Sequence, residues 1–355
     1  MYSREILPPP EHLVANGKPA FGTFAGFPKK LDIRGVEAPF GVPLPHLLTN
    51  FRIKSSLMFV FNIGQYVGTV DFFDQKAFGY AEVTFWEKDS GRKFSYRTLM
   101  GPRRRFIPHN LEAGYCASLG KQRYIRISWD HARDRLSVIF NLAGDSARPA
   151  AHGAFIAHYT SPALCEMTTN VPSPTRRRCS ASYVATMAIH GSLSLEKTKL
   201  ATALPMDKTD GQALLAINRN YYNFLSESEL VTAAGIADGK PVSFTIANTV
   251  EDAVDSDIVN QNLLFVDGVC TPLPPVLITH PFGLEHKWVI QDTENMVDLT
   301  FTPVSDNFRD MSFFVIHSKQ HTIFGRFEGN LKTKDGDDIP IHNFEGLAKH
   351  QVLRL

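Results

Sequence analysis

The chain has 355 residues, of which 43% are hydrophobic and 21% charged. This composition excludes intrinsic disorder, and the length is enough for two cores of about 150 to 200 residues each. Lys and Arg number 37 against 36 Asp and Glu, so the net charge of +1 provides no broad attraction to nucleic acid or anionic membranes, and we expect no nucleic-acid partner.

The N-terminal segment does not have the basic end and apolar run of a signal peptide, because Pro8, Pro9 and Pro10 stand between Glu5 and Glu11. The sequence also has no run of about 20 uninterrupted apolar residues, the length needed to span a bilayer. Its four cysteines lie far apart without a CxxC pair, which predicts free thiols and argues against a disulfide framework or a zinc site. We therefore predict a cytoplasmic protein with no integral membrane association.

Strand-like alternation marks the first half of the chain. Residues 80–86 place apolar side chains on one face and Tyr, Glu, Thr and Trp on the other. The same period of two occurs at 124–130 and 135–140, and residues 131–133 between them predict a hairpin loop. These segments predict neighbouring antiparallel strands.

The second half repeats this pattern at residues 242–246 and 297–301. Three Asp-Gly pairs stand between apolar runs, where Gly tolerates the positive φ of tight hairpin turns. They are Asp238-Gly239, Asp267-Gly268 and Asp335-Gly336. Many short, meandering strands are therefore expected here too.

Helical patterns are scarce, with candidates only around Glu11–Ala15 and Glu227–Ala234, which argues against a parallel α/β architecture. A polar stretch interrupted by prolines marks a boundary between the halves. We predict an all-β fold with an N-terminal half at residues 1–165, a linker at 166–178 and a C-terminal half at 179–355. Each half is expected to form an antiparallel barrel or highly curved sheet, the two packed side by side.

The chain contains 26 Phe. These rings either fill two large cores or line an apolar cavity, since closed barrels of about eight strands can hold one small ligand. The sequence leaves both alternatives open.

Local catalytic motifs such as GxSxG, GxxxxGK, GxGxxG and HExxH are absent from the sequence. His317 and His321 form an HxxxH pair, but in a strand they stand about 13 Å apart and cannot share a metal ion, so no metal site or cofactor is expected. His321 is instead a candidate general acid or base, or else a strand histidine at a barrel rim. Asp298, the second catalytic candidate, points either into a lumen or toward solvent.

Residues 218–223 combine amides, a guanidinium group and two phenols, which could orient a polar head group or form a hydrogen-bonded loop without a ligand. Two Arg triplets, Arg103–Arg105 and Arg176–Arg178, are candidate phosphate or carboxylate contacts, or solvated loops. The expected ligand-binding residues are Arg219, Tyr221, Tyr222, Asn248, Asn260, Trp288 and Gln320.

A series of motifs in fixed order carries a family resemblance. Near the end of the chain they are residues 295–303, Gln320-His321, Phe324-Gly325, Phe327, Gly329 and Asp335-Gly336. Earlier motifs are Gly22-Thr23-Phe24, Arg52-Ile53-Lys54, Val266-Asp267-Gly268 and Leu273-Pro274. With them the chain, from about Asn16 onward, resembles domain-of-unknown-function family 2804, a family without a settled activity.

Two positions depart from the family pattern. The acidic residue that usually follows the final Gly-x-Ala is Lys349 here, and the Asp that usually precedes the Arg/Tyr cluster is Asn218. If either carboxylate is catalytic in relatives, the resemblance implies a lost or altered activity. More remotely, the chain is similar to the two-part lipocalin-like proteins that include carotenoid 1,2-hydratase and tocopherol cyclase, which implies two calycin- or lipocalin-like units with few short helices.

Three functions fit these observations. The first is binding of a hydrophobic small molecule, a lipid or isoprenoid, in a cavity in or between the barrels. The second is cofactor-free hydration, cyclisation or isomerisation of an apolar substrate, with His321 or Asp298 as the proton donor. The third is a non-catalytic interaction scaffold that uses a sheet edge or loop, and a filled barrel interior would favour it.

Overall fold

The structure is a computed structural model that describes residues 2–76, 78–101, 106–196, 208–248, 255–313 and 316–354. It confirms the all-β fold: the one helix in these ranges is the short α1 (His46–Phe51), and every other regular element is a strand. No helix of the described chain is long and apolar enough to cross a membrane. The triplet Arg103–Arg105 lies outside the described residues.

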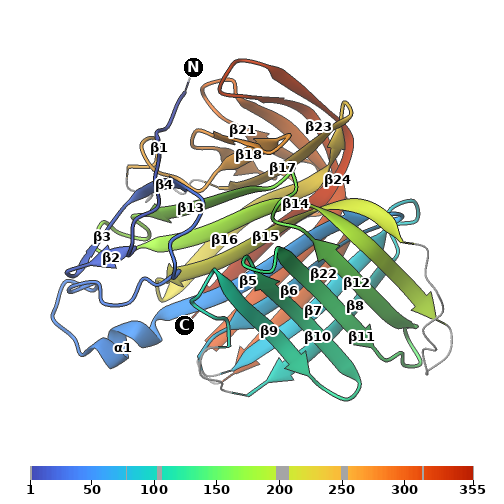
Figure 1. The fold of residues 1–355 in the computed structure, drawn as a ribbon, viewed down its shortest axis with the longest axis horizontal. Helices are drawn as coiled ribbons and strands as arrows, with labels where there is room; N and C mark the ends of the chain where they lie inside the picture. The colour runs from blue at the N-terminus through green and yellow to red at the C-terminus, as the bar shows by residue number, and fades with distance from the viewer. Residues whose placement is uncertain are drawn as a thin grey trace.

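The first sheet has 13 strands. They are β1 (Ile6–Leu7), β4 (Gly22–Ala25), β5 (Ile53–Ile63), β6 (Tyr66–Asp74), β7 (Gly79–Glu87), β8 (Lys93–Met100), β9 (Ala113–Leu119), β10 (Arg123–Asp130), β11 (Arg135–Leu142), β12 (Ala150–Ala157), β13 (Cys165–Val171), β14 (Ser180–Glu196) and β15 (Thr209–Tyr221). The main path runs β8-β7-β6-β5-β15-β14-β12-β11-β10-β9, and it curls into a nearly closed barrel (Figure 1). Outside it, β2 (Val14–Ala15) and β3 (Lys18–Pro19) form a separate pair.

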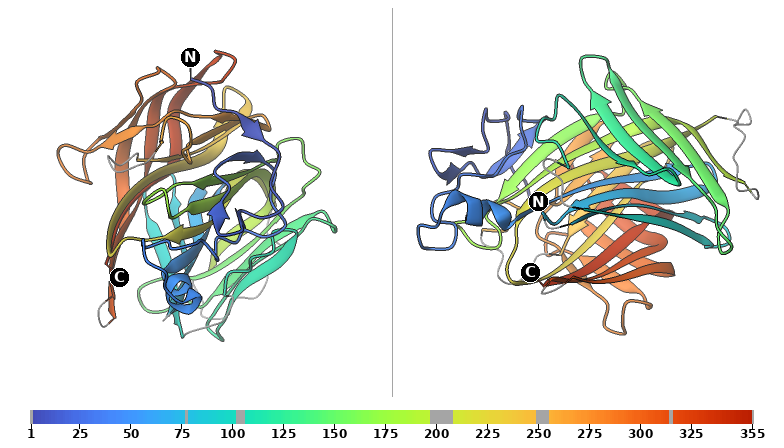
Figure 2. Two further views of the ribbon diagram at one scale, coloured as in Figure 1. Left: turned by 90° about the vertical axis from the view of Figure 1, so that its left-hand side faces the viewer. Right: turned by 90° about the horizontal axis from the view of Figure 1, so that it is seen from below.

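The second sheet has nine strands and forms a half-barrel beside the first. They are β16 (Leu225–Ala237), β17 (Lys240–Ala247), β18 (Leu263–Val266), β19 (Val269–Pro272), β20 (Leu277–Thr279), β21 (Trp288–Gln291), β22 (Val297–Phe313), β23 (Ile316–Lys332) and β24 (Asp338–Arg354). Their order is β19-β18-β17-β16-β24-β23-β22-β21-β20, drawn in gold to red in Figure 2.

The predicted turns form hairpins. Asp238 and Gly239 have φ of 49° and 74° between β16 and β17, and Asp267 and Gly268 have 48° and 75° between β18 and β19. Two successive positive φ values are typical of type I′ turns, which match the twist of the flanking strands. The loop predicted at residues 131–133 likewise joins β10 to β11.

The change from one sheet to the other falls between Tyr221 and Leu225. Residues 166–178, predicted as the linker, include most of β13, which pairs with β14 and β4. Strands β14 and β15 follow this segment and complete the first sheet, since β15 pairs with β5. The first unit thus takes its closing strands from beyond the predicted boundary.

Both predicted helical segments are wrong. Residues 227–234 lie in β16, where they pair with β24 and β17, and residues 11–15 end in the short strand β2. Apolar residues in a short window fit a helix or a strand equally well, and distant pairing partners decide between them.

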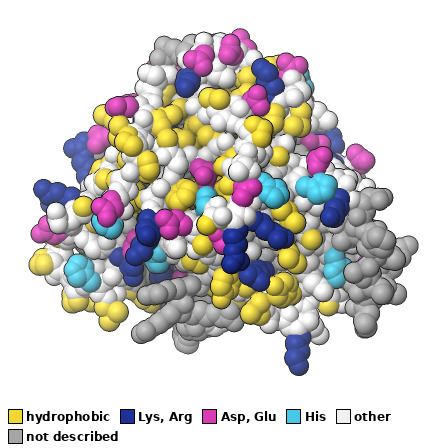
Figure 3. Space-filling model, in the orientation of Figure 1, with side chains coloured by type: hydrophobic (Ala, Val, Ile, Leu, Met, Phe, Trp, Pro, Cys, Tyr) yellow, Lys and Arg dark blue, Asp and Glu magenta, His cyan; other side chains and the backbone are white. Residues whose placement is uncertain are grey.

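Three apolar cores organise the molecule. One fills the barrel and one lies under the second sheet. A third joins the two sheets, where the rings of Trp86 and Phe324 stack with centroids 5.9 Å apart. Because the second sheet covers the outer face of β7, both faces of that strand are buried, not one as its alternation indicates. On the surface, acidic and basic side chains are interspersed across the face shown in Figure 3.

Candidate functional site

A cavity of about 190 Å³ lies between the two sheets, and we name it the inter-sheet pocket. Strands β5, β6, β7, β14 and β15 form one wall, and β16, β17, β23 and β24 form the other. Its polar lining includes Asp71, Tyr80, Asn218, Tyr222, Glu229, Gln320 and Lys349, and its apolar lining includes Met58, Phe72, Phe73, Ala216, Leu230 and Ala247.

Strand registry explains why these side chains meet. Residues paired across an antiparallel sheet point to the same face. On the outer face of the barrel one such row is Ala216, Met58, Asp71, Glu82 and Arg97, from β15 through β8. The facing rows of the second sheet are Leu230, Lys349, Thr322 and Asn307, and Ser228, Gln351, Gln320 and Arg309.

An ion pair crosses the pocket. Lys349 Nζ lies 2.8 Å from Asp71 Oδ1, and each side chain is 12% exposed. Thr69 donates a hydrogen bond of 3.0 Å to the other carboxylate oxygen of Asp71. A carboxylate and an ammonium group are therefore fixed at the pocket wall, largely shielded from water.

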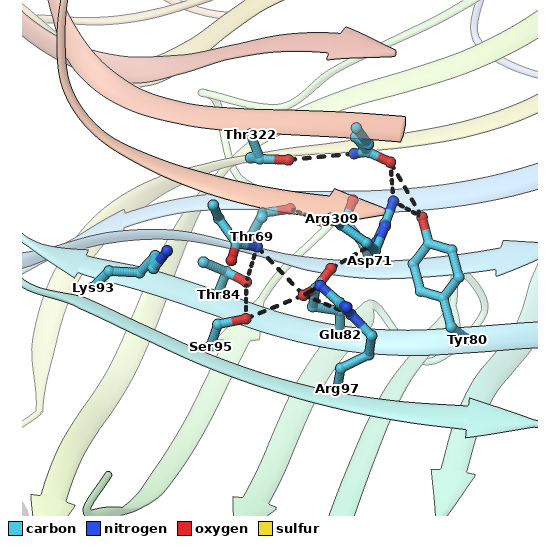
Figure 4. Close-up of polar contacts among 12 residues, drawn as sticks. Thr69, Asp71, Tyr80, Glu82, Thr84, Lys93, Ser95, Arg97, Arg309 and Thr322 are labelled. Carbon is cyan, nitrogen blue, oxygen red and sulfur yellow. Dashed lines mark hydrogen bonds and ion pairs between the residues drawn. The ribbon is translucent and has the colours of Figure 1, made fainter. Parts of the chain in front are cut away.

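A second polar cluster, the Glu82–Arg309 network, extends from the pocket between the sheets (Figure 4). Arg309 on β22 lies 2.7 Å from Glu82 on β7, and Arg97 lies 2.8 Å from the same carboxylate. Arg309 also donates to Tyr80 and Gln320, both of which line the pocket. The network thus fixes two pocket side chains in place.

The charges of this network are set by burial and by its partners. Burial acts to raise the pKa of Glu82, but the neighbouring Arg309 and Arg97 outweigh it and hold that pKa below its ordinary value. Burial raises the pKa of Tyr80, so its hydroxyl stays protonated at neutral pH. The pocket therefore presents a neutral phenol beside the Asp71–Lys349 ion pair.

Glu229 borders the inter-sheet pocket and also contacts two histidines. Its Oε1 atom contacts His280 Nε2 and lies 3.2 Å from His350 Nδ1. Among the described residues these three form the group whose donor atoms are close enough to hold a metal ion, all within 4.8 Å of one another.

Two of the expected ligand-binding residues, Tyr222 and Gln320, line the inter-sheet pocket. Arg219 and Tyr221 instead face the barrel core, 1% and 3% exposed. Arg219 donates to Ser55 and to the carbonyls of Leu31, Ile107 and Pro108, which ties the loops at the barrel mouth to β5. Tyr221 packs edge-on against Phe40.

The remaining expected ligand-binding residues lie in or next to the second sheet: Trp288 in β21, Asn248 directly after β17, and Asn260 in the loop before β18. Asn248 donates a 2.8 Å hydrogen bond to Glu229. Trp288 is buried, donates to the Leu284 carbonyl and packs against His280. Asn260 donates to the carbonyls of Ser256 and Leu273 and therefore holds a loop.

The two catalytic candidates lie apart from each other. His321 on β23 is half-buried, bonds through Nδ1 to Asp306 at 2.6 Å and stacks on Phe308. Its ring centroid stands 6.2 Å from that of His350. Asp298 is exposed on β22 and accepts a hydrogen bond from Gln291. Neither residue lines the inter-sheet pocket.

Asp71, Glu82 and Glu229 were not identified from the sequence. Only for Glu82 did the sequence contain an indication of a buried polar site: Glu82 lies on the same strand face as Tyr80 and Trp86. An acidic residue among aromatic side chains indicates a buried partner when both faces of a strand are covered. Asn218 and Lys349, the two positions expected to depart from the family pattern, both line the inter-sheet pocket.

The fold and pocket define a class of protein with two curved, mainly antiparallel sheets and a cavity of mixed polar and apolar lining between them. Residues 4–355 match the model of DUF2804, a domain of unknown function, and the chain belongs to this family. The solved structure of kievitone hydratase from Nectria haematococca is 9% identical, with a TM-score of 0.45, over 85% of this chain and 88% of that chain. No curated protein matches the chain significantly.

Proposed function

We propose that this protein binds a small amphiphilic molecule, such as an oxygenated lipid or isoprenoid, in the inter-sheet pocket. The observation that carries the proposal is the mixed lining of that pocket. Ligand sites are typically apolar cavities with a few convergent polar groups. Here Met58, Phe73 and Leu230 supply apolar surface, while Lys349 and Gln320 supply polar groups.

The barrel interior is a poorer place for a ligand because its aromatic rings pack on one another. Phe61 lies 5.0 Å from Phe155, and Phe85 lies 5.2 Å from Phe94, between ring centroids. All four rings are at most 5% exposed. Such contacts support the alternative that the Phe residues build a core. A filled barrel alone would favour a scaffold, whereas the polar pocket between the sheets favours a ligand.

A second cavity, of about 560 Å³, lies at the barrel mouth and is lined in part by Arg219 and Phe51. Its carboxylates already have partners: Asp32 pairs with Arg34 at 2.5 Å and Asp74 with Lys76 at 3.2 Å. Asp71 of the inter-sheet pocket is paired as well, with Lys349, but this pocket in addition presents amides and hydroxyls from both sheets toward one another, which favours it as the binding site.

A pocket-filling substitution tests the proposal. Ala247 lines the pocket and is half-buried at the end of β17, so Ala247→Phe places a ring in the cavity. Ile236→Phe is the matched control, since Ile236 is 55% exposed on β16 outside the pocket. Both variants should be screened by ligand-observed NMR against small molecules that range from hydrocarbons to isoprenoid alcohols and acids.

Molecules with one polar group and a short hydrocarbon part are expected to bind the wild type and Ile236→Phe but not Ala247→Phe. Equal binding to all three proteins, or binding of hydrocarbons alone, would contradict the proposed site. A protein that binds nothing in the panel would contradict the proposed function as well.

A second candidate function is cofactor-free proton transfer, favoured by the Asp71–Lys349 ion pair at the pocket wall. An ammonium group 2.8 Å from a carboxylate provides an acid and a base beside one bound molecule. If a ligand found in the screen is turned over, Asp71→Asn and Lys349→Met should each abolish turnover. His321→Ala, outside the pocket, should leave turnover unchanged, and the reverse pattern would assign the proton transfer to His321.

A further inference from the structure

A cluster of imidazole and carboxylate groups lies on the face of the second sheet opposite the inter-sheet wall. Glu229 on β16 pairs with His350 on β24, so their side chains point to the same face. His280 follows directly after β20 and brings Nε2 into contact with the same carboxylate. Three segments that are distant in sequence thus converge on one point.

The donor set matches a transition-metal site. Zn²⁺ takes imidazole nitrogens and carboxylate oxygens at about 2.0–2.2 Å, which places tetrahedral donors about 3.4 Å apart. In the described chain the atoms of Glu229, His280 and His350 lie within 4.8 Å of one another, with His350 Nδ1 3.2 Å from Glu229 Oε1. Small side-chain movements would bring all three donors to one ion.

A second layer of contacts orients these groups. Asn248 Nδ2 donates a hydrogen bond of 2.8 Å to Glu229 Oε2, and Asn248 Oδ1 accepts one from the backbone N–H of Ile278. These two bonds fix the Glu229 carboxylate relative to β20. The other ring nitrogen of His350, Nε2, stands 3.6 Å from Glu227 Oε1. A carboxylate behind a ligating histidine and a hydrogen bond behind a ligating carboxylate are typical of metal sites.

Access to the cluster is partial. Glu229 is 8% exposed, His350 14% and His280 25%, so an ion could enter from solvent and keep a water molecule as a further ligand. Three protein ligands with an open position are the arrangement of catalytic zinc sites, whereas structural sites use four.

We propose that Glu229, His280 and His350 bind one divalent transition-metal ion, with Zn²⁺ the best match to two imidazoles and a carboxylate. The Glu229 side chain points away from the inter-sheet pocket, whose wall its neighbours Ser228 and Leu230 form, so the ion would stand across β16 from that pocket. The proposal does not depend on the ligand proposed above, since metal binding is measured without it.

The experiment is a titration of chelator-treated full-length protein with Zn²⁺ by calorimetry and with Co²⁺ by absorption spectroscopy. We expect one tight site per chain and a Co²⁺ ligand-field spectrum typical of low coordination number. Glu229→Gln, His280→Gln and His350→Gln should each weaken binding by more than about 100-fold, and Asn248→Ala by about 10- to 100-fold.

His321→Gln is the matched control, because this neighbouring histidine bonds to Asp306 and has no contact with Glu229 among the described interactions. It should bind Zn²⁺ with wild-type affinity and so separate this site from weak binding by the other histidines of the chain. No stoichiometric binding by the wild type, or equal affinity in the ligand variants, would overturn the proposal. If a ligand variant does not fold, the wild-type Co²⁺ titration still decides: one saturable ligand-field band supports the site and its absence refutes it.

Discussion

Replacing Glu82 by Gln is expected to weaken the interface between the two sheets. The Glu82 carboxylate is 4% exposed and pairs with Arg309, which is 2% exposed, and with Arg97. It also accepts from Ser95 and Asn307. A neutral amide would leave Arg309 as a buried cation without its carboxylate, and breaking a buried ion pair in this way costs about 3–5 kcal/mol.

Urea denaturation followed by tryptophan fluorescence measures this loss, since Trp86 lies in the core that joins the sheets. A double-mutant cycle isolates the pair. Arg309→Met removes the unpaired cation. The double variant should therefore lose about 1–3 kcal/mol less stability than the two single variants lose in sum. Additive effects, or a loss below about 1 kcal/mol in Glu82→Gln, would show that the Glu82–Arg309 pair does not stabilise the interface.

The same substitution should change the response to acid. The folded-state pKa of Glu82 lies below its ordinary value. The Glu82 carboxylate therefore contributes fully to the free energy of unfolding above the ordinary pKa, and this contribution is lost as the pH falls through the lowered pKa. The wild type should therefore lose stability below about pH 4 more steeply than Glu82→Gln does. Equal slopes would contradict the assigned charge state.

Two other perturbations test other parts of the fold. Burial and the neighbouring Arg219 lower the pKa of His109 to about 4, so folding excludes a proton that the unfolded chain binds below about pH 6.5. The free energy of unfolding should therefore fall by about 2.5 kcal/mol between pH 6.5 and 4. His109→Gln should flatten this dependence, and an unchanged slope in that variant would disprove it. At Gly191, a Cβ would stand 2.0 Å from the Ala154 carbonyl oxygen, so Gly191→Ala should lower the melting temperature. Gly101→Ala is the control and should not lower it, because no described atom lies within 4 Å of a Cβ at that position. Similar melting temperatures for the two variants would show that the paired strands β12 and β14 adjust freely to the added methyl group.

The local features of the fold could be predicted from the sequence because local chemistry determines them. The alternation at residues 80–86 marks a strand, and Asp238-Gly239 forms the hairpin that its tolerance of positive φ indicates. Long-range pairing had no such signal. Residues 227–234 fit a helix by local pattern, and their pairing with β17 and with β24, the latter more than 100 residues away, makes them a strand.

The site could be predicted only in part, for the same reason. Tyr222 and Gln320, two of the residues predicted to bind a ligand, line the pocket, but the other lining residues come from the other sheet or from distant strands. Asp71 and Lys349 stand 278 positions apart in the chain and meet only because one sheet packs on the other. Local residue spacing therefore cannot predict the Asp71–Lys349 contact, and it cannot predict that Glu229, His280 and His350 lie together.

The most direct test of the account is native mass spectrometry of freshly purified protein, followed by denaturing extraction of whatever small molecule accompanies it. We expect a stoichiometric amphiphilic molecule with the wild type and with Ile236→Phe, and none with Ala247→Phe. The same molecule retained by Ala247→Phe, or a wild type that binds no amphiphile in the subsequent screen, would contradict a ligand site between the sheets.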